Sequence, residues 1–136
     1  MIIMSVDYGD SRTGIAVCDR LQKFAHPVEV IKESYEPKLI SRIGEIAKER
    51  DVGLIVVGLP KNMDSSEGER AGKCRSFAAE IEKETGIKTD VIDERLTTVS
   101  AANYLNITDT RGKKRKDIID AVSAVIILQD YLDSRR

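Results

Sequence analysis

Three acidic residues lie where strand-like or apolar segments of the chain meet a turn or a helix. Asp7 closes an apolar run at the N-terminus, Glu94 closes a second run, and Asp120 lies inside a third. Carboxylates beside a core are costly unless they are paired or bound to a cation. Because these three come from distant parts of one small chain, convergence on a divalent metal explains them better than three separate turns. The sequence therefore predicts a metal-dependent enzyme.

Length and composition predict one soluble, globular domain over residues 1–136, with 41% hydrophobic and 33% charged residues. No apolar run is long enough to span a membrane. The N-terminus lacks the basic and small-residue features of a secretory signal, so a cytoplasmic location is the default expectation. Cys18 and Cys74 have no metal-ligand spacing and are predicted to be buried thiols rather than a disulfide.

The positive charge of the chain is concentrated in one place. The net charge is −1, which argues against binding nucleic acid through bulk electrostatics. Five cations nevertheless fall within six residues, namely Arg111, Lys113, Lys114, Arg115 and Lys116. This run has two interpretations, a solvated charged loop or a loop that holds an anionic backbone near the acids. We predict the second, with the loop ordered only when substrate is present.

Hydrophobic periodicity predicts an α/β fold with three antiparallel strands followed by alternating helices and strands. The strands are expected at 2–8, 13–19, 24–31, 54–57 and 88–93, and the helices from 37 to before 50 and at 67–85, 97–105 and 117–132. Right-handed crossovers make the first, fourth and fifth strands parallel, with the first strand central in a mixed five-stranded sheet flanked by helices. Asp7 and Glu94 then share the carboxyl edge of the sheet, which Asp120 must reach on the last helix.

Four segments in this order resemble the YqgF family, also called RuvX, over nearly the whole chain. They are Asp7-x-Gly9-x-x-Arg12-x-Gly14-x-Ala16, Val57-Gly58-Leu59-Pro60, Asp93-Glu94-Arg95-x-Thr97-Thr98 and Asp120-x-x-x-Ala124-x-x-Ile127-Leu128-x-x-Tyr131-Leu132. The resemblance implies an RNase H-like, RuvC-type fold and a nuclease that processes the 5′ end of precursor 16S ribosomal RNA. An older assignment of the family is Holliday junction resolution. Carried over by residue, the acids of the site are Asp7, Glu94 and Asp120.

The chemistry of the three acids fits that implication. Hard carboxylates suit Mg²⁺ or Mn²⁺, and two such ions about 3.5–4 Å apart can serve phosphodiester hydrolysis. We expect Asp7 to bridge the ions, while Glu94 and Asp120 each complete one coordination sphere. Asp93 competes with Glu94, since successive strand residues face opposite sides, and Glu94 is preferred. Asp117 is either a further ligand or an acid that the helix dipole favours.

The remaining candidates are polar residues near the acids that could contact substrate. Arg12 could hold a phosphate or pair with Asp10, and Asn62 lies in a loop that is either a substrate lid or a connection. Arg95 could contact a nucleic-acid backbone. The predicted substrate-binding set is completed by Lys113, Lys114 and Lys116.

Other classes of function are weaker but not all excluded. A nucleotide-binding module built on the first hairpin would need a second lobe, for which 136 residues leave no room. A non-catalytic nucleic-acid-binding factor on the same fold is harder to exclude, although such a protein gains nothing from acids where phosphate must lie. The sequence does not distinguish structured RNA such as precursor ribosomal RNA from branched DNA, or a monomer from a homodimer.

Overall fold

A mixed five-stranded sheet forms the centre of the computed structural model, which describes residues 1–59, 68–93 and 112–135, and side chains within 1–59, 68–92 and 121–135. The central strand β1 (Ile2–Asp7) pairs antiparallel with β2 (Thr13–Cys18) and parallel with β4 (Val52–Leu59). The edge strands are β3 (Ala25–Ile31) and β5 (Thr89–Asp93), which gives the order β3-β2-β1-β4-β5. The central position of the first strand is therefore confirmed.

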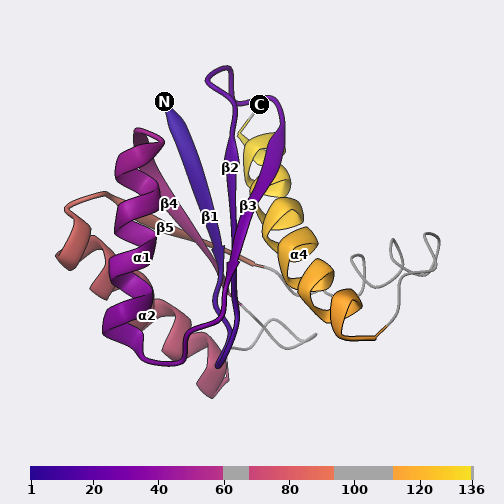
Figure 1. Ribbon diagram of the computed structural model, residues 1–136. Helices are drawn as coiled ribbons and strands as arrows, with labels where there is room; N and C mark the ends of the chain where they lie inside the picture. Colours follow the sequence, from indigo (N-terminus) through magenta and orange to yellow (C-terminus); the bar gives the residue numbers. More distant parts are fainter. Residues whose placement is uncertain (60–67, 94–111, 136) are drawn as a thin grey trace.

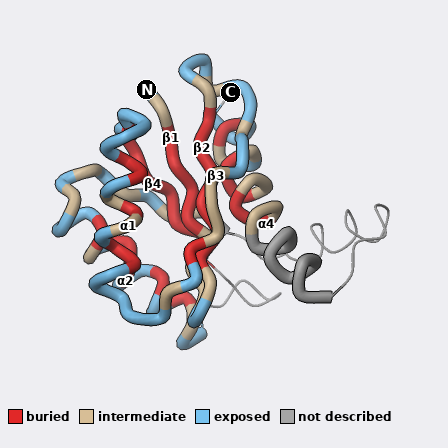
Figure 2. The backbone as a smooth tube through the Cα atoms, viewed as in Figure 1, coloured by how far each residue is buried: buried red, intermediate tan, exposed pale blue. Residues whose placement is uncertain are grey.

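Helices cover both faces of this sheet (Figure 1). On one face lie α1 (Glu36–Glu49), with Pro37 in its first turn, and α2 (Glu69–Thr85), which ends at Gly86 with a φ of 72°. The other face is covered by α4 (Gly112–Ser134). Buried residues run along β1, β2 and β4 (Figure 2), because strands enclosed on both faces must be apolar on both. Among the described residues, no helix is both long and apolar enough to cross a membrane.

Strand alternation divides the side chains of β1 between two cores. Met4 and Val6 pack in the cluster that includes residues of α1 and α2, whereas Ile3 packs in the cluster that includes α4. Ser5 also faces α4, because its buried hydroxyl donates a hydrogen bond to the Ala124 carbonyl at 2.6 Å. Asp7 has the same phase as Ile3 and Ser5. The strand therefore assigns position 7 to the face of the sheet that α4 covers.

Two predicted boundaries were wrong. The strand expected at 54–57 extends over Val52–Leu59, because Gly58 does not end it but pairs with Ile92 of β5. The last helix begins at Gly112 rather than at residue 117, so residues 112–116 are helical and the predicted substrate-ordered loop is incorrect there. Lys and Arg are good helix formers, and no Gly or Pro interrupts residues 113–134. The helix expected at 97–105 lies outside the described residues.

The other predicted features of the core agree with the structure. Pro27 lies in β3, which is an edge strand as predicted. The register of β2 and β3 shifts between Ile15 and Ala16, next to that proline. Cys18 and Cys74 are both buried and are not joined in a disulfide, as predicted.

Candidate active site at the carboxyl edge of the sheet

Asp7 stands at the end of the central strand on rigid backbone. It is half-buried and pairs with Gly14 at the last rung of the β1–β2 ladder. The hairpin that follows is tight, since a Cβ atom placed on Gly9 would lie 2.1 Å from the Arg12 carbonyl oxygen. The Gly9 amide also donates to the Thr13 hydroxyl at 3.5 Å. Only glycine permits this close approach of the backbone, so the turn holds the end of β1 in one conformation.

Helix α4 runs antiparallel to β1, as three contacts show. Near the carboxyl end of β1, Ser5 reaches Ala124. At the opposite end of the sheet, the Gln129 side chain accepts a hydrogen bond from the Ala25 amide at 3.0 Å and donates to the Lys23 carbonyl at 2.9 Å. The helix therefore begins beside the carboxyl edge and ends beside the N-terminus of β1 (Figure 1).

This direction brings the backbone of Asp120 to the level of Asp7. Asp120 precedes Ala124 by four residues, which is one turn and about 6 Å along a helix. Asp7 follows Ser5 by two residues, which is about 6.6 Å along a strand. Because the two elements are antiparallel and in contact at Ser5 and Ala124, both displacements point the same way. The structure thus places these two predicted site residues at the same level.

The fifth strand reaches the same edge. Val6 pairs with Val57 of β4, and Gly58 pairs with Ile92 of β5, so Ile92 lies level with position 7. Two strand spacings of about 4.8 Å separate β1 from β5. Ile92 packs in the cluster that includes α4, whereas Val91 packs in the opposite cluster.

Strand phase therefore bears on the choice between Asp93 and Glu94. Position 93 has the phase of Val91 and of the opposite cluster. Asp7 has the phase of Ile92, so position 93 does not share the phase of Asp7. Glu94 itself lies outside the described residues, as do Asn62 and Arg95.

A contact that sequence reasoning missed fastens the hairpin to α2. Arg70 forms an ion pair with Asp10 at 2.7 Å, donates to the Tyr8 carbonyl at 2.5 Å, and lies 4.9 Å from the centre of the Tyr8 ring. Phe77 also contacts that ring and stacks on it with ring centres 3.9 Å apart. Burial raises the pKa of the Tyr8 hydroxyl, and the charge of Glu36 raises it further. No local pattern marks Arg70, because its partners lie 60 residues or more away in sequence.

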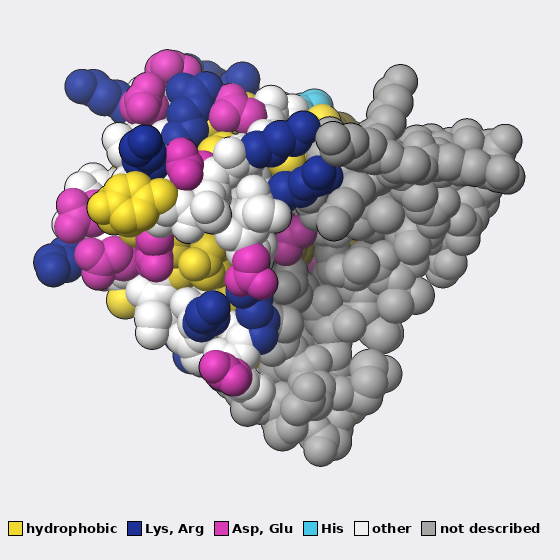
Figure 3. Space-filling model, turned by 60° about the horizontal axis from the view of Figure 1, so that its bottom comes forward, with side chains coloured by type: hydrophobic (Ala, Val, Ile, Leu, Met, Phe, Trp, Pro, Cys, Tyr) yellow, Lys and Arg dark blue, Asp and Glu magenta, His cyan; other side chains and the backbone are white. Residues whose placement is uncertain are grey.

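The cationic candidates divide between the hairpin and α4. Arg12 is half-buried and directly precedes β2. Lys113, Lys114 and Lys116 belong to the first turns of α4, before Asp120. Figure 3 looks toward the carboxyl edge and shows Lys and Arg mixed with Asp and Glu over its coloured part. In the coloured part of this view, neither positive nor negative side chains dominate the surface.

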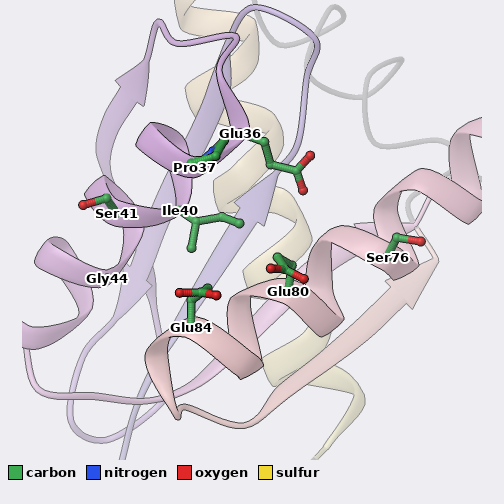
Figure 4. A pocket seen from close by; sticks show the side chains of 8 residues that line it. All are labelled: Glu36, Pro37, Ile40, Ser41, Gly44, Ser76, Glu80 and Glu84. Atoms are coloured by element: carbon green, nitrogen blue, oxygen red, sulfur yellow. The ribbon is translucent and has the colours of Figure 1, made fainter.

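Among the described residues, no three His, Cys, Asp or Glu side chains gather as a metal-binding group. Of the proposed acids, only Asp7 has its side chain in that set. A hollow of about 750 Å³ lies elsewhere, between α1 and α2 (Figure 4). Glu36, Glu80 and Glu84 line it, so it repels phosphate, and it lies on the opposite face of the sheet from α4.

Strand order and helix placement define an RNase H-like fold, and solved structures confirm it. The RuvC protein of T. thermophilus in complex with a Holliday junction substrate aligns with a TM-score of 0.61 and 14% identity, over 99% of this chain and 95% of that one. The Fowlpox virus resolvase in complex with Holliday junction DNA also aligns with a TM-score of 0.61 and 14% identity, over 99% of both chains. At this identity the likeness shows the fold alone.

Sequence relatives define the family. The RuvX family, described as Holliday junction resolvase, matches residues 1–134, and the chain belongs to it. A protein of Leuconostoc mesenteroides is 45% identical over 138 residues, covering 99% of this chain and 96% of its own. A protein of Endomicrobium trichonymphae is 46% identical over 132 residues, covering 96% and 94%. Both carry the name "Putative pre-16S rRNA nuclease". The predicted family resemblance is therefore confirmed.

Proposed function

We propose that this chain is a metal-dependent nuclease that hydrolyses phosphodiester bonds and processes the 5′ end of precursor 16S ribosomal RNA. The observation that carries the proposal is the buried hydrogen bond from Ser5 to Ala124 at 2.6 Å. It fixes α4 on the central strand in a register that brings positions 7 and 120 to one level. Strand phase supports Glu94 as the third acid.

The residues at this edge fit a divalent metal. Asp7 supplies a hard carboxylate from a strand that is hydrogen-bonded on both sides, so its backbone does not need to rearrange to bind an ion. Asp7, Glu94 and Asp120 would hold Mg²⁺ or Mn²⁺. Such ions, when bound, supply an activated water and stabilise the leaving oxygen. The chain's own part is to orient the carboxylates on three packed elements. Asp117, one turn before Asp120, is a possible fourth acid.

The start of α4 is suited to hold the phosphate backbone. Its first turn contains no acid, although the positive end of a helix dipole favours acids, and it carries Lys113 and Lys114. Lys116 precedes Asp120 by one turn and shares its row on the helix. Cations that the helix dipole disfavours are better explained by an anionic ligand. Arg12, Asn62 and Arg95 are the further proposed contacts.

The names of the relatives support ribosomal RNA as the substrate. Two relatives that match nearly end to end both carry the name "Putative pre-16S rRNA nuclease", with identities of 45% and 46%. A nuclease with this substrate acts where ribosomes are assembled, which for a bacterial relative is the cytoplasm. The experiment below also measures whether the active form is a monomer or a homodimer.

A cleavage panel tests the proposal. Purified protein of measured oligomeric state is incubated with precursor 16S RNA, linear RNA, linear DNA and four-way junctions, with Mg²⁺ or Mn²⁺. We expect cleavage of the precursor RNA and near-complete loss in D7N, E94Q and D120N. The control D93N removes a neighbouring charge of opposite strand phase and should retain most activity. Cleavage by the D7N protein at the parent rate contradicts the proposed site.

A second candidate function is the resolution of Holliday junctions. It is favoured by the family description and by the fold shared with two resolvases solved with junction DNA. The same panel decides between the two, because the substrate with the higher kcat/KM is the one whose transition state the site binds better. A preference of the parent protein for four-way junctions over precursor RNA favours resolution.

A further inference from the structure

We propose that Arg70 is a positioning residue that holds the hairpin carrying Asp7 in the geometry needed for metal binding. This inference rests on the proposed function for its catalytic consequence. Arg70 is the second residue of α2, a helix that contains none of the predicted site residues. Its role follows from three contacts with one turn.

The guanidinium group spans the turn from both ends. One nitrogen forms the ion pair with Asp10 at 2.7 Å, and the other donates to the Tyr8 carbonyl at 2.5 Å. Two bonds to points two residues apart determine the direction of the backbone between them. The planar fork of an arginine can make both bonds at once, which a lysine ammonium with its single nitrogen does less well.

The contacts that Arg70 makes with the hairpin form a clamp, and the Tyr8 ring gives this clamp a second point of attachment. Its face contacts the Arg70 guanidinium at 4.9 Å and stacks on Phe77 at 3.9 Å, with the ring planes only 6° apart. Arg70 and Phe77 are two turns apart on α2, so residue 8 is fastened to a long section of one rigid helix. The hairpin is thereby held on the face of the sheet that α2 covers.

Asp7 is the residue immediately before this clamp. Successive strand residues point to opposite faces, so fixing Tyr8 toward α2 directs position 7 toward α4. The β1–β2 ladder ends at the pair of Asp7 and Gly14, so Tyr8 and Asp10 lie beyond the last strand pair of this hairpin. The contacts of Arg70 therefore hold the backbone immediately beyond this last strand pair. A shift of about 1 Å in a site residue can lower a catalytic rate by about a hundredfold, which makes this support consequential.

The test compares R70M, R70K and the control K73M. Lys73 is an exposed cation of the same helix, so its removal changes the local charge equally. Cleavage rates are measured at saturating substrate over a series of Mn²⁺ concentrations. We expect R70M to lower kcat about tenfold or more, to raise the Mn²⁺ midpoint, and to leave KM within about twofold. R70K should fall between R70M and the parent.

The metal dependence separates positioning from folding. Because bound metal also stabilises the folded state, rates are compared at a temperature at which circular dichroism shows every variant to be fully folded even without metal. Under that condition a misplaced ligand raises the Mn²⁺ midpoint and is partly rescued by excess metal. Melting temperatures of the three variants are compared for the same reason. Parent-like kcat and Mn²⁺ midpoint in R70M overturn the inference, and so does a uniform loss that K73M shares.

A spectroscopic readout tests the inference even if no substrate is cleaved. Backbone amide resonances of Asp7 and Gly14 are followed in ¹⁵N-labelled protein. R70M should shift both relative to the parent, R70K should shift them less, and K73M should leave them in place. Unchanged resonances in R70M overturn the clamp. If R70M shifts both resonances but the parent protein neither cleaves nor binds Mn²⁺, the clamp is supported and the proposed function is refuted.

Discussion

Replacing Ser5 with valine tests the contact that places α4 on the sheet. Ser5 is fully buried, and its hydroxyl donates to the Ala124 carbonyl at 2.6 Å. Valine removes the donor and adds volume where the strand and the helix approach closely. S5A removes the donor alone. The pair of variants therefore separates the hydrogen bond from the spacing of the two elements.

The expected cost follows from the environment of the two partners. Loss of one neutral hydrogen bond costs about 0.5–1.5 kcal/mol. The Ala124 carbonyl lies inside a helix and keeps its bond to the amide four residues ahead, so it is not left without a donor. S5A should therefore cost about 1 kcal/mol, or about 4 °C in Tm for a domain of this size. Overpacking adds about 1–3 kcal/mol in S5V.

Activity should respond more steeply than stability in S5V. The added methyl groups displace α4 from β1, and Asp120 lies only one turn from the contact. A displacement approaching 1 Å at the site is expected to lower kcat by about tenfold to a hundredfold. S5A leaves the spacing unchanged and should retain activity near that of the parent.

Urea denaturation and the cleavage assay are run on S5A, S5V and the control S41V. Ser41 is exposed on α1, so its replacement should alter neither measurement. If S5V folds and cleaves like the parent, the contact does not set the position of α4. The alignment of Asp7 with Asp120 then loses its physical basis.

Three further changes test other parts of the structure. G9A places a Cβ atom 2.1 Å from the Arg12 carbonyl oxygen and should destabilise the fold by at least about 1 kcal/mol in urea denaturation; a parent-like midpoint contradicts this close approach. The Arg42 hydrogen bond lowers the pKa of Glu29, so this stabilisation is complete above about pH 4.3 and is lost as the pH falls through the lower folded pKa. Both side chains are partly exposed, so solvent screens the pair, and E29Q should flatten the dependence of stability on pH between about 5 and 3; a slope as steep as the parent's argues against it. Joint replacement of Lys113, Lys114 and Lys116 by alanine should weaken nucleic-acid binding irrespective of sequence. The slope of log affinity against log salt concentration should fall by about 0.7–0.9 per lost phosphate contact. An unchanged slope indicates that the three cations are only solvated.

The central part of the fold was predictable because the sequence specifies it locally. Apolar runs at the positions of β1 and β4 require burial on both faces, and the crossover rule then orders the parallel strands. The position of Asp7 at the carboxyl edge follows directly. The end of β4 was not predictable from Gly58 alone, because its pairing with Ile92 depends on a neighbouring strand.

Contacts between distant segments set the limits of sequence reasoning at the site. Arg70 looks like any polar residue at a helix start, and its relation to Tyr8 and Asp10 exists only after α2 has packed beside the hairpin. The direction of α4 likewise depends on Ser5 and Gln129, whose partners lie 119 and 104 residues away. Periodicity describes which residues are buried, but it does not specify what each polar side chain meets.

At the start of α4, helix propensity and the helix dipole have opposite effects on stability. Good helix propensity extends the helix to Gly112, while the positive end of the helix dipole disfavours the cations at 113–116. The half that packs on the sheet, through Ala124, Leu128 and Leu132, supplies the apolar burial that supports the whole helix. The cationic first turns of the helix therefore do not need an apolar core of their own to remain helical. Phosphate groups bound there would offset both the dipole and the mutual repulsion of the cations, so the same cations that weaken the start of the helix are the ones expected to hold substrate.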